Sequence, residues 1–266
     1  MVHRPRPGVF ITQEKWAGAQ PSERYALTVR GVLLAHPTWI ASHHAALAVQ
    51  DLPLFGVDLS VVDVAAAVRG CRIRQGLHMH VAAPGHLDQA DRGSVRAVPV
   101  AAACVLTATR SGLEAGVVAM DAALRRHLTT REQLTEALAL PGARFGVGLA
   151  RGAIELADPQ AESPGESRTR LLLSGAGFEV RSQVTITDDG GDIGRVDFLV
   201  GGRVVVEFDG LVKYDGANGK MELAREKVRE DRLRSAGYAV VRLTWADLNH
   251  PDRVIAKVRR GLAAAA

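Results

Sequence analysis

The fold is decided by the stretch Arg195-Val196-Asp197-Phe198-Leu199-Val200, followed by Gly201-Gly202 and by Arg203-Val204-Val205-Val206-Glu207-Phe208-Asp209-Gly210. Apolar runs this short, joined by two glycines, predict a β-hairpin with a two-residue turn. The strand period of two places Glu207 and Asp209 on one face and Phe208 on the other. A buried strand has no structural use for carboxylates, because their desolvation costs free energy unless a partner offsets it.

A hard divalent cation is the partner that this pattern favours. Mg²⁺, or Mn²⁺ in its place, takes oxygen ligands from one or two carboxylates and keeps its other positions for water and substrate phosphate. Asp197 is embedded between Val196 and Phe198, which favours a metal role over a salt bridge to Arg195 or to a neighbouring strand. The residues around Glu207 are apolar, so an unpaired carboxylate there would be costly.

The two runs belong to a longer pattern of five blocks. In chain order these are Glu162-Ser163-Pro164-Gly165-Glu166-Ser167-Arg168, Val196-Asp197-Phe198, Val206-Glu207-Phe208-Asp209-Gly210, Glu226-Lys227-Val228-Arg229-Glu230-Asp231-Arg232-Leu233 and Gly237-Tyr238-Ala239-Val240-Val241-Arg242. The pattern resembles the PD-(D/E)XK nuclease core, and in detail the small domain related to very-short-patch repair endonucleases. The resemblance implies a restriction-endonuclease-like mixed β-sheet flanked by helices, and hydrolysis of DNA phosphodiester bonds with Mg²⁺ or Mn²⁺. Asp197 and Glu207 would hold the metal.

Glu166 has two competing interpretations. In the nuclease family the first core helix contributes an acid that helps to bind the metal through water, and Glu166 matches that acid, with Glu162 as the reserve. Ser163-Pro164-Gly165-Glu166 also fits a capping box, in which Pro164 takes the first helical position and Glu166 reaches back to the Ser163 amide. The sequence does not decide between them.

Asp209 is the departure from the family motif. The motif ends with a lysine, whose ammonium orients the attacking water and stabilises the pentacoordinate phosphorane. An acid before Gly210 is common in relatives of the repair-endonuclease type, and Asp209 is expected to be a further metal ligand or to accept a hydrogen bond at the turn. A substitute cation is expected from Lys213 or Lys227, although Lys227 could instead form an i,i+4 pair with Asp231.

Two functions stay open, with a third reading beside them. The first is a Mg²⁺-dependent endodeoxyribonuclease, in which Arg229, Arg232 and Arg234 contact DNA phosphates without reading the sequence. The rival is an antitoxin-like or regulatory protein that binds DNA or a partner and keeps the nuclease fold as a scaffold, because Asp209 replaces the motif lysine. Its protein partner would be a toxin or a second copy of the chain. In the third reading the acids bind metal only for stability.

The upstream part resembles the N-terminal region of actinobacterial AbiEi-type antitoxin proteins. Arg6-Pro7-Gly8-Val9-Phe10-Ile11 would suit the wing strand of a winged helix. The helices that should precede it are absent, so either translation starts later than in relatives or the reading head has been lost. Pro21 to Ala35 and the stretch opened by Ser42 predict helices. We therefore expect an α+β chain, mainly helical with a remnant wing over residues 1–157 and restriction-endonuclease-like over residues 158–266.

Two histidine pairs have spacings that bear on metal binding. His43 and His44 are adjacent on a predicted helix, where their side chains point about 100° apart and rarely share one metal. His78 and His80 would lie on one face of a strand, a spacing that could hold a metal. Because no third ligand lies nearby in sequence, a half-exposed strand face is the favoured interpretation.

Composition bounds these expectations. The 266 residues are 47% hydrophobic and 23% charged, enough for a sizeable core and most consistent with two domains. The chain lacks an apolar stretch of membrane-spanning length and a signal-peptide core, so a cytoplasmic protein without a membrane partner is expected. The spacing of Cys71 and Cys104 predicts free thiols. Net charge is +4, of which residues 160–266 carry only +1, so DNA binding has to be argued from local clusters.

Overall fold

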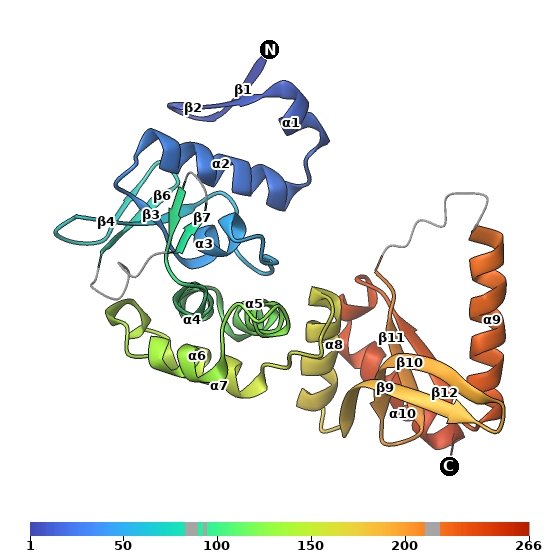
Figure 1. The fold of residues 1–266 in the computed structure, drawn as a ribbon. Coiled ribbons are helices and arrows are strands. Elements are labelled where there is room, and N and C mark those ends of the chain that lie inside the picture. Colours follow the sequence, from blue (N-terminus) through green and yellow to red (C-terminus); the bar gives the residue numbers. More distant parts are fainter. Residues whose placement is uncertain (83–89, 93–94, 211–218, 266) are drawn as a thin grey trace. The chain divides into compact units, whose positions relative to one another are not determined.

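The computed structural model describes residues 1–82, 90–92, 95–210 and 219–265, and it is an α+β protein. The chain separates into two compact units, Met1–Pro159 and Gln160–Ala266 (Figure 1). The division falls two residues beyond the boundary drawn from the sequence. Within the described residues, none of the helices combines the length and apolar character that crossing a membrane requires.

The N-terminal unit begins with a hairpin rather than a single wing strand. Strand β1 (Val2–Arg6) pairs antiparallel with β2 (Val9–Thr12), and Gly8 in the turn between them has a φ of +78°. This positive φ is easily adopted by glycine, so the stretch expected to form one strand turns back on itself. Helix α1 (Gln13–Gly18) follows, and then α2, which has the predicted bounds Pro21–Ala35.

A six-stranded mixed sheet forms the middle of the N-terminal unit. Its strands are β3 (Ile40–Ala41), β4 (Val62–Ala66), β5 (Arg72–Arg74), β6 (Leu77–Val81), β7 (Ala90–Arg92) and β8 (Val95–Ala97), in the order β5-β6-β4-β3-β8-β7. The sequence predicted a strand at His78 and His80 within a mainly helical region, and the structure adds five further strands that join it in one sheet. Every residue of β4 is buried, and its parallel pairing with β6 sets Asp63 beside His78.

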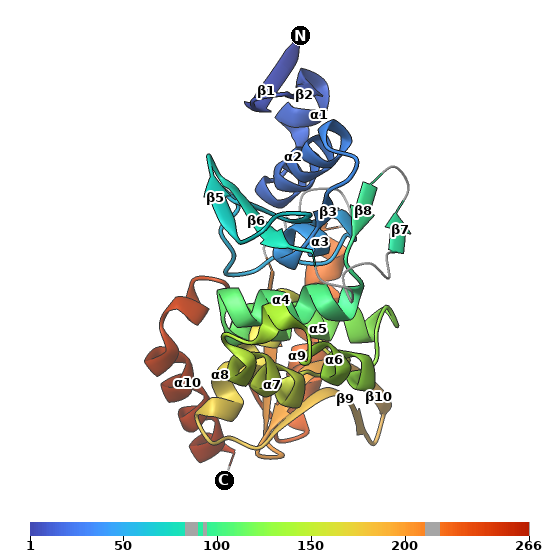
Figure 2. The ribbon, with the colours of Figure 1, turned by 90° about the vertical axis from the view of Figure 1, so that its left-hand side faces the viewer.

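Helices complete this unit. They are α3 (His43–Val49), α4 (Val100–Ser111), α5 (Leu113–Arg125), α6 (Arg131–Ala137) and α7 (Val147–Leu156), with a 3₁₀ turn at Pro141–Ala143. Helix α3 is buried along its whole length and lies between α2 and α4 (Figure 2). Ser42 is its N-cap residue, as predicted, but the Ser42 hydroxyl contacts the His43 ring instead of capping a backbone amide.

The C-terminal unit is a mixed sheet flanked by helices, as the sequence predicted. Its elements are α8 (Pro164–Gly175), β9 (Val180–Asp188), β10 (Gly191–Val200), β11 (Val204–Phe208), α9 (Gly219–Ser235), β12 (Ala239–Leu243), a 3₁₀ turn at Asp247–Asn249 and α10 (Pro251–Ala264). The strand order is β12-β11-β10-β9, with β11 parallel to β12 and the other pairs antiparallel. The connection from β11 to β12 runs through α9 (Figure 1).

Both faces of this sheet are covered. Leu173 of α8 and Val254 of α10 join the core on one face, and Leu233 of α9 joins the core on the other. The β10–β11 hairpin pairs Val200 with Val204, so its loop has three residues, not the two predicted. Both glycines of the loop have positive φ, 54° and 69°, and this left-handed backbone accommodates the extra residue.

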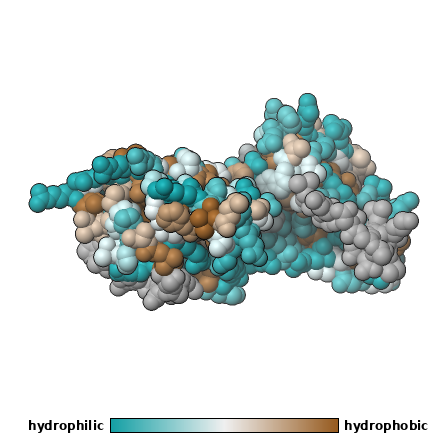
Figure 3. All heavy atoms as spheres, turned by 90° about the horizontal axis from the view of Figure 1, so that it is seen from above, coloured by the Kyte–Doolittle hydropathy of each residue, from teal (hydrophilic) through white to brown (hydrophobic). Residues whose placement is uncertain are grey.

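The surface is mixed in character. On the face seen in Figure 3, hydrophobic residues lie singly or in small groups among hydrophilic ones. Large apolar side chains that are exposed include Phe10, Ile73, Phe145 and Val228, which come from separate segments of the chain. Scattered exposure of this kind is ordinary for a folded protein and points to no binding surface.

Candidate functional site

Asp197 and Glu207 follow the same end of the β10–β11 hairpin register. That antiparallel register pairs Phe198 of β10 with Val206 of β11, and each acid is the next residue beyond this pair. The charge of Glu207 contributes to raising the pKa of Asp197, so the two carboxylates interact electrostatically. The structure therefore brings near each other the two acids that the sequence assigned to one metal.

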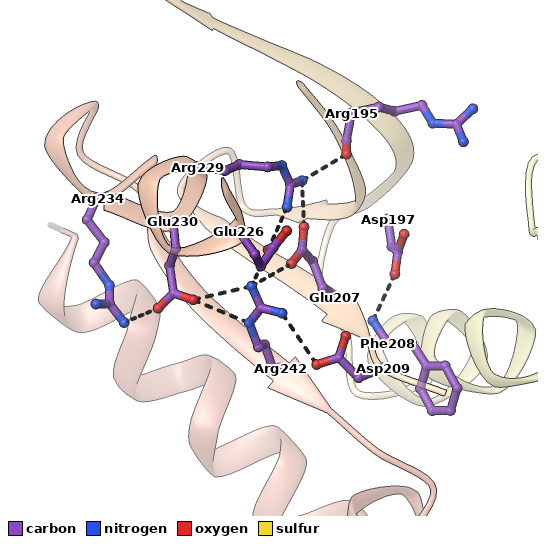
Figure 4. A network of polar contacts seen from close by, with 10 residues as sticks. All are labelled: Arg195, Asp197, Glu207, Phe208, Asp209, Glu226, Arg229, Glu230, Arg234 and Arg242. Carbon is purple, nitrogen blue, oxygen red and sulfur yellow. Dashed lines mark hydrogen bonds and ion pairs between the residues drawn. The ribbon is translucent and has the colours of Figure 1, made fainter. Parts of the chain in front are cut away.

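Glu207 is held by two arginines (Figure 4). Glu207 as a whole residue is only 8% exposed. Glu207 Oε1 lies 2.7 Å from Arg229 of α9, and Oε2 lies 3.5 Å from Arg242 of β12. Arg242 is also the residue beside Glu207 in the parallel β11–β12 register, so strand pairing itself delivers this guanidinium.

The two arginines also form ion pairs with acids of α9 and with the acid that follows β11. Arg242 pairs with Asp209 at 3.4 Å, with Glu230 at 3.3 Å and with Glu226. Arg229 pairs with Glu226 at 3.1 Å and donates a hydrogen bond to the Arg195 carbonyl. Because one guanidinium reaches both Glu207 and Asp209, these two acids share a side of the strand, in agreement with the period of two. We call these residues, with Asp197, the carboxylate network.

Asp197 has a different environment. Its Oδ2 accepts a hydrogen bond from the Phe208 amide at 2.8 Å, and within the described part of the chain it has no ion-pair partner. Burial raises the pKa of Asp197 to about 6; the Phe208 hydrogen bond opposes this rise, and the charges of Glu166, Glu207 and Asp209 add to it. The alternative salt bridge to Arg195 is not formed, because Arg195 pairs with Glu162 at 3.0 Å.

Glu166 takes part in the N-terminal cap of α8, though not as a complete capping box. The Ser163 hydroxyl accepts a hydrogen bond from the Glu166 amide at 3.2 Å, as predicted. Glu166 Oε2 accepts hydrogen bonds from the Glu162 amide and from the Gln183 side chain, both at 2.9 Å, instead of from the Ser163 amide. The side chain is buried, so its carboxylate is fixed by these partners.

Gly165 explains how Glu166 comes close to Asp197. A Cβ on Gly165 would lie 1.9 Å from the ring of Phe208, well inside van der Waals contact. Only glycine lets α8 lie this close to the end of β11. The same packing includes an edge-on contact between Phe208 and Trp245, with ring centroids 5.0 Å apart.

Of the two predicted lysines, the structure describes Lys227 alone, and it does not place Lys227 at the acids. Lys213 lies outside the described residues. Lys227 is exposed on α9, and in the described part of the chain no hydrogen bond or ion pair joins it to the acids or to Asp231. The positive charge at the carboxylates comes from Arg229 and Arg242.

The arginines differ from their expected roles. Arg229 was expected to contact phosphate and instead pairs with Glu207. Arg232 pairs with Asp188 at 2.6 Å, and Arg234 pairs with Glu230. Sequence reasoning gave Arg242 no role, and the signal that could have found it is a single charge within the apolar run of β12.

The donor atoms of the carboxylate network fit a hard divalent cation, but their arrangement fits less well. Mg²⁺ prefers oxygen ligands, which these acids supply. Both oxygens of Glu207 are engaged by arginine, so an ion bound there has to displace at least one guanidinium. Among the described residues, three ligands close enough to hold an ion are found instead in the N-terminal unit, at His43, Asp63 and His80.

Those three residues change the interpretation of the histidine pairs. The third ligand that the sequence lacked is Asp63, brought beside His78 and His80 by strand pairing. The signal was present, because Asp63 stands between Val62 and Val64 just as Asp197 stands between Val196 and Phe198. In both places an acid lies inside an apolar run, so the same cost of desolvation predicts a partner for its carboxylate.

Comparisons with known proteins give relatives but no family. No protein-family model matches the chain, and no solved structure matches it. The chain is similar to Uncharacterized protein MT2308 of Mycobacterium tuberculosis strain CDC 1551 / Oshkosh and to Uncharacterized protein Rv2248 of strain ATCC 25618 / H37Rv. Each is 28% identical over 253 residues, which cover 93% of this chain and 91% of the relative. The similarity therefore extends over both units.

Proposed function

We propose that the C-terminal unit is a divalent-metal-dependent DNA endonuclease domain. The observation that carries this proposal is the half-buried Asp197 carboxylate at the end of the β10–β11 register, which has no ion-pair partner among the described residues and whose pKa is raised to about 6 by burial and by the charges of Glu166, Glu207 and Asp209. Excess negative charge of this kind is what a bound Mg²⁺ or Mn²⁺ would neutralise. When bound, the ion polarises the scissile phosphate and lowers the pKa of its water.

Each neighbouring acid has a distinct role in this proposal. Asp197 and Glu207 would hold the ion directly. Glu166 would add its charge from α8 through water, and its hydrogen bonds to the Glu162 amide and the Gln183 side chain fix that carboxylate. The ion pair between Asp209 and Arg242 would keep that guanidinium beside the acids.

Arg229 and Arg242 replace the motif lysine in the proposal. Each carries a permanent charge and a planar fork of donors that matches phosphate oxygens. A guanidinium not engaged by Glu207 would be able to donate to the oxygens of the phosphate that is cleaved. Among the residues that the structure describes, Lys227 has no contact that supports a catalytic role, and Lys213 stays a prediction from the sequence.

A second candidate function is supported by the ion pairs of Glu207. A carboxylate held by two arginines is also what a non-catalytic scaffold would contain, because the arginines offset its burial without metal. In that case the domain binds DNA or a protein partner, a toxin or a second copy of the chain, without cleaving DNA. The proposals differ in one measurable step, phosphodiester hydrolysis.

The test uses the full chain with supercoiled, mismatched and single-stranded DNA, each with Mg²⁺, Mn²⁺ or a chelator. The nuclease proposal expects metal-dependent cleavage that falls to background in Glu207→Gln and Asp197→Asn. The matched control is Glu179→Gln, an exposed acid in the same unit, which should cleave like the wild type. Intact DNA under every condition, together with DNA binding measured by fluorescence anisotropy, would favour the scaffold instead.

A further inference from the structure

The N-terminal unit contains a buried carboxylate surrounded by histidines. Asp63 has no exposed surface. Its Oδ1 lies 2.6 Å from His80 Nε2 and 3.3 Å from His78 Nδ1, and its Oδ2 lies 3.3 Å from His44 Nδ1. His43 stacks on His80 with ring centroids 4.1 Å apart. We call Asp63 and these four residues the histidine cluster.

The tautomer of His44 reveals a conflict within the cluster. His44 Nε2 lies 3.1 Å from the carbonyl of Asp58 and 3.2 Å from that of Val61. Because a carbonyl only accepts hydrogen bonds, this nitrogen must carry the proton. In a neutral ring Nδ1 is then a bare acceptor, and it faces Asp63 Oδ2, which is also an acceptor.

Three polar atoms of the cluster are buried without a hydrogen-bond partner: Asp63 Oδ2, His44 Nδ1 and His78 Nδ1. Buried polar atoms almost always have partners, so a group of three in one place indicates a missing water or ion. The unpartnered ring nitrogens of His44 and His78 both face the Asp63 carboxylate, and a cation bound there could accept lone pairs from all of these groups.

We propose that the histidine cluster is a binding site for a transition-metal ion of the zinc class, with His43, Asp63 and His80 as ligands. One ligand atom from each of these residues lies within 4.8 Å of the other two. Mixed imidazole and carboxylate donors suit Zn²⁺ and its neighbours, whereas Mg²⁺ prefers oxygen alone. The site is separate from the carboxylate network in residues, in donor chemistry and in the unit that holds it.

The geometry requires small adjustments. Tetrahedral ligands about 2.0–2.1 Å from zinc are about 3.4 Å apart, so two ligand atoms at the 4.8 Å limit would have to approach by about 1.4 Å. The ion replaces the proton shared by His80 and Asp63, and these two atoms move apart to the same spacing. His44 and His78, each with an unpartnered Nδ1, are the candidates for the fourth position.

Two neighbouring residues bear on this arrangement. Ser42 Oγ lies 3.0 Å from His43 Nδ1, which orients that ring and leaves its other nitrogen for the metal. Arg110 competes with the ion, because its Nε lies 3.8 Å from Asp63. Its side chain is 37% exposed, however, and can turn to solvent.

The test is metal binding by the full chain after chelator treatment. We expect one Zn²⁺ per chain by elemental analysis, a visible absorption band typical of tetrahedral Co²⁺, and a rise in melting temperature with Zn²⁺. His80→Ala and Asp63→Asn should weaken binding by about 10- to 100-fold or more. His250→Ala, which removes an exposed histidine of the C-terminal unit, is the matched control and should bind like the wild type.

Wild-type protein that retains no Zn²⁺ and gives no Co²⁺ band would overturn the proposal, and this result does not depend on whether a variant folds. Variants that bind Zn²⁺ as tightly as the wild type would overturn it as well. Glu207→Gln separates this site from the proposed nuclease site, because that variant should keep Zn²⁺ binding whether or not the wild type cleaves DNA.

Discussion

Replacing Asp197 with asparagine should stabilise the metal-free protein at neutral pH. An acid with a higher pKa in the native state than in the unfolded chain loses its proton more readily on unfolding. The native state is therefore progressively destabilised as pH rises from 3.8, the ordinary pKa of an aspartate, to about 6, the pKa of Asp197 in the folded protein, and the penalty is constant above that. Asparagine carries no charge, and its Oδ1 can still accept the Phe208 hydrogen bond.

The magnitude follows from the shift of Asp197. About two pH units at 1.36 kcal/mol each give an upper bound of about 3 kcal/mol. The side chain is only half-buried, and screening by solvent reduces this to about 1–2 kcal/mol. We expect Asp197→Asn to be more stable than the wild type by that amount at pH 7.5, with the difference shrinking below pH 6 and nearly gone at pH 4.

Trp245 provides the assay because it packs against Phe208 beside the site. With Trp16 and Trp39 changed to phenylalanine, its fluorescence follows urea unfolding of the C-terminal unit in the presence of a chelator. Asp231→Asn, at an exposed acid on α9, is the control and should change stability little. If Asp197→Asn is equally or less stable at pH 7.5, the account of a strained carboxylate at this position is wrong.

Two further predictions concern packing and thiol reactivity. Gly165→Ala should destabilise the C-terminal unit by about 1–3 kcal/mol, because its methyl group overlaps the Phe208 ring; Gly175→Ala in the same helix meets no atom within 4 Å and is the control, and equal urea midpoints for the two would contradict the packing. Cys71 is exposed, whereas Cys104 is buried and burial raises the pKa of its thiol to about 12. A thiol reagent should therefore label one cysteine in the native protein and both after denaturation, and rapid native labelling of both would show that Cys104 is accessible.

Local sequence patterns predicted much of the fold. Helix α2 begins and ends at the predicted residues, and Ser163 caps α8 as expected. Apolar runs correctly indicated β10 and β11, and the alternation of side chains correctly grouped Glu207 with Asp209. These features depend on residues close together in the chain, where capping and periodicity act.

What the sequence could not provide is pairing between distant segments. Arg242 reaches Glu207 because β12 lies parallel to β11, and Asp63 reaches His78 because β4 lies parallel to β6. Both connections pass through intervening elements, and neither register can be derived from local periodicity. The acids could be singled out as unusual, but not the cations and imidazoles that surround them.

Arg242 determines the register in which the edge strand β12 pairs with β11. Strand β12 is otherwise apolar on both sides, with Val240 packed on one core and Val241 on the other. A slip of one position would exchange these two similar residues at small cost, whereas it would carry the guanidinium from four acids into hydrocarbon. A single charge thus specifies the alignment that aliphatic side chains leave ambiguous, and removing it should permit misaligned forms of this edge.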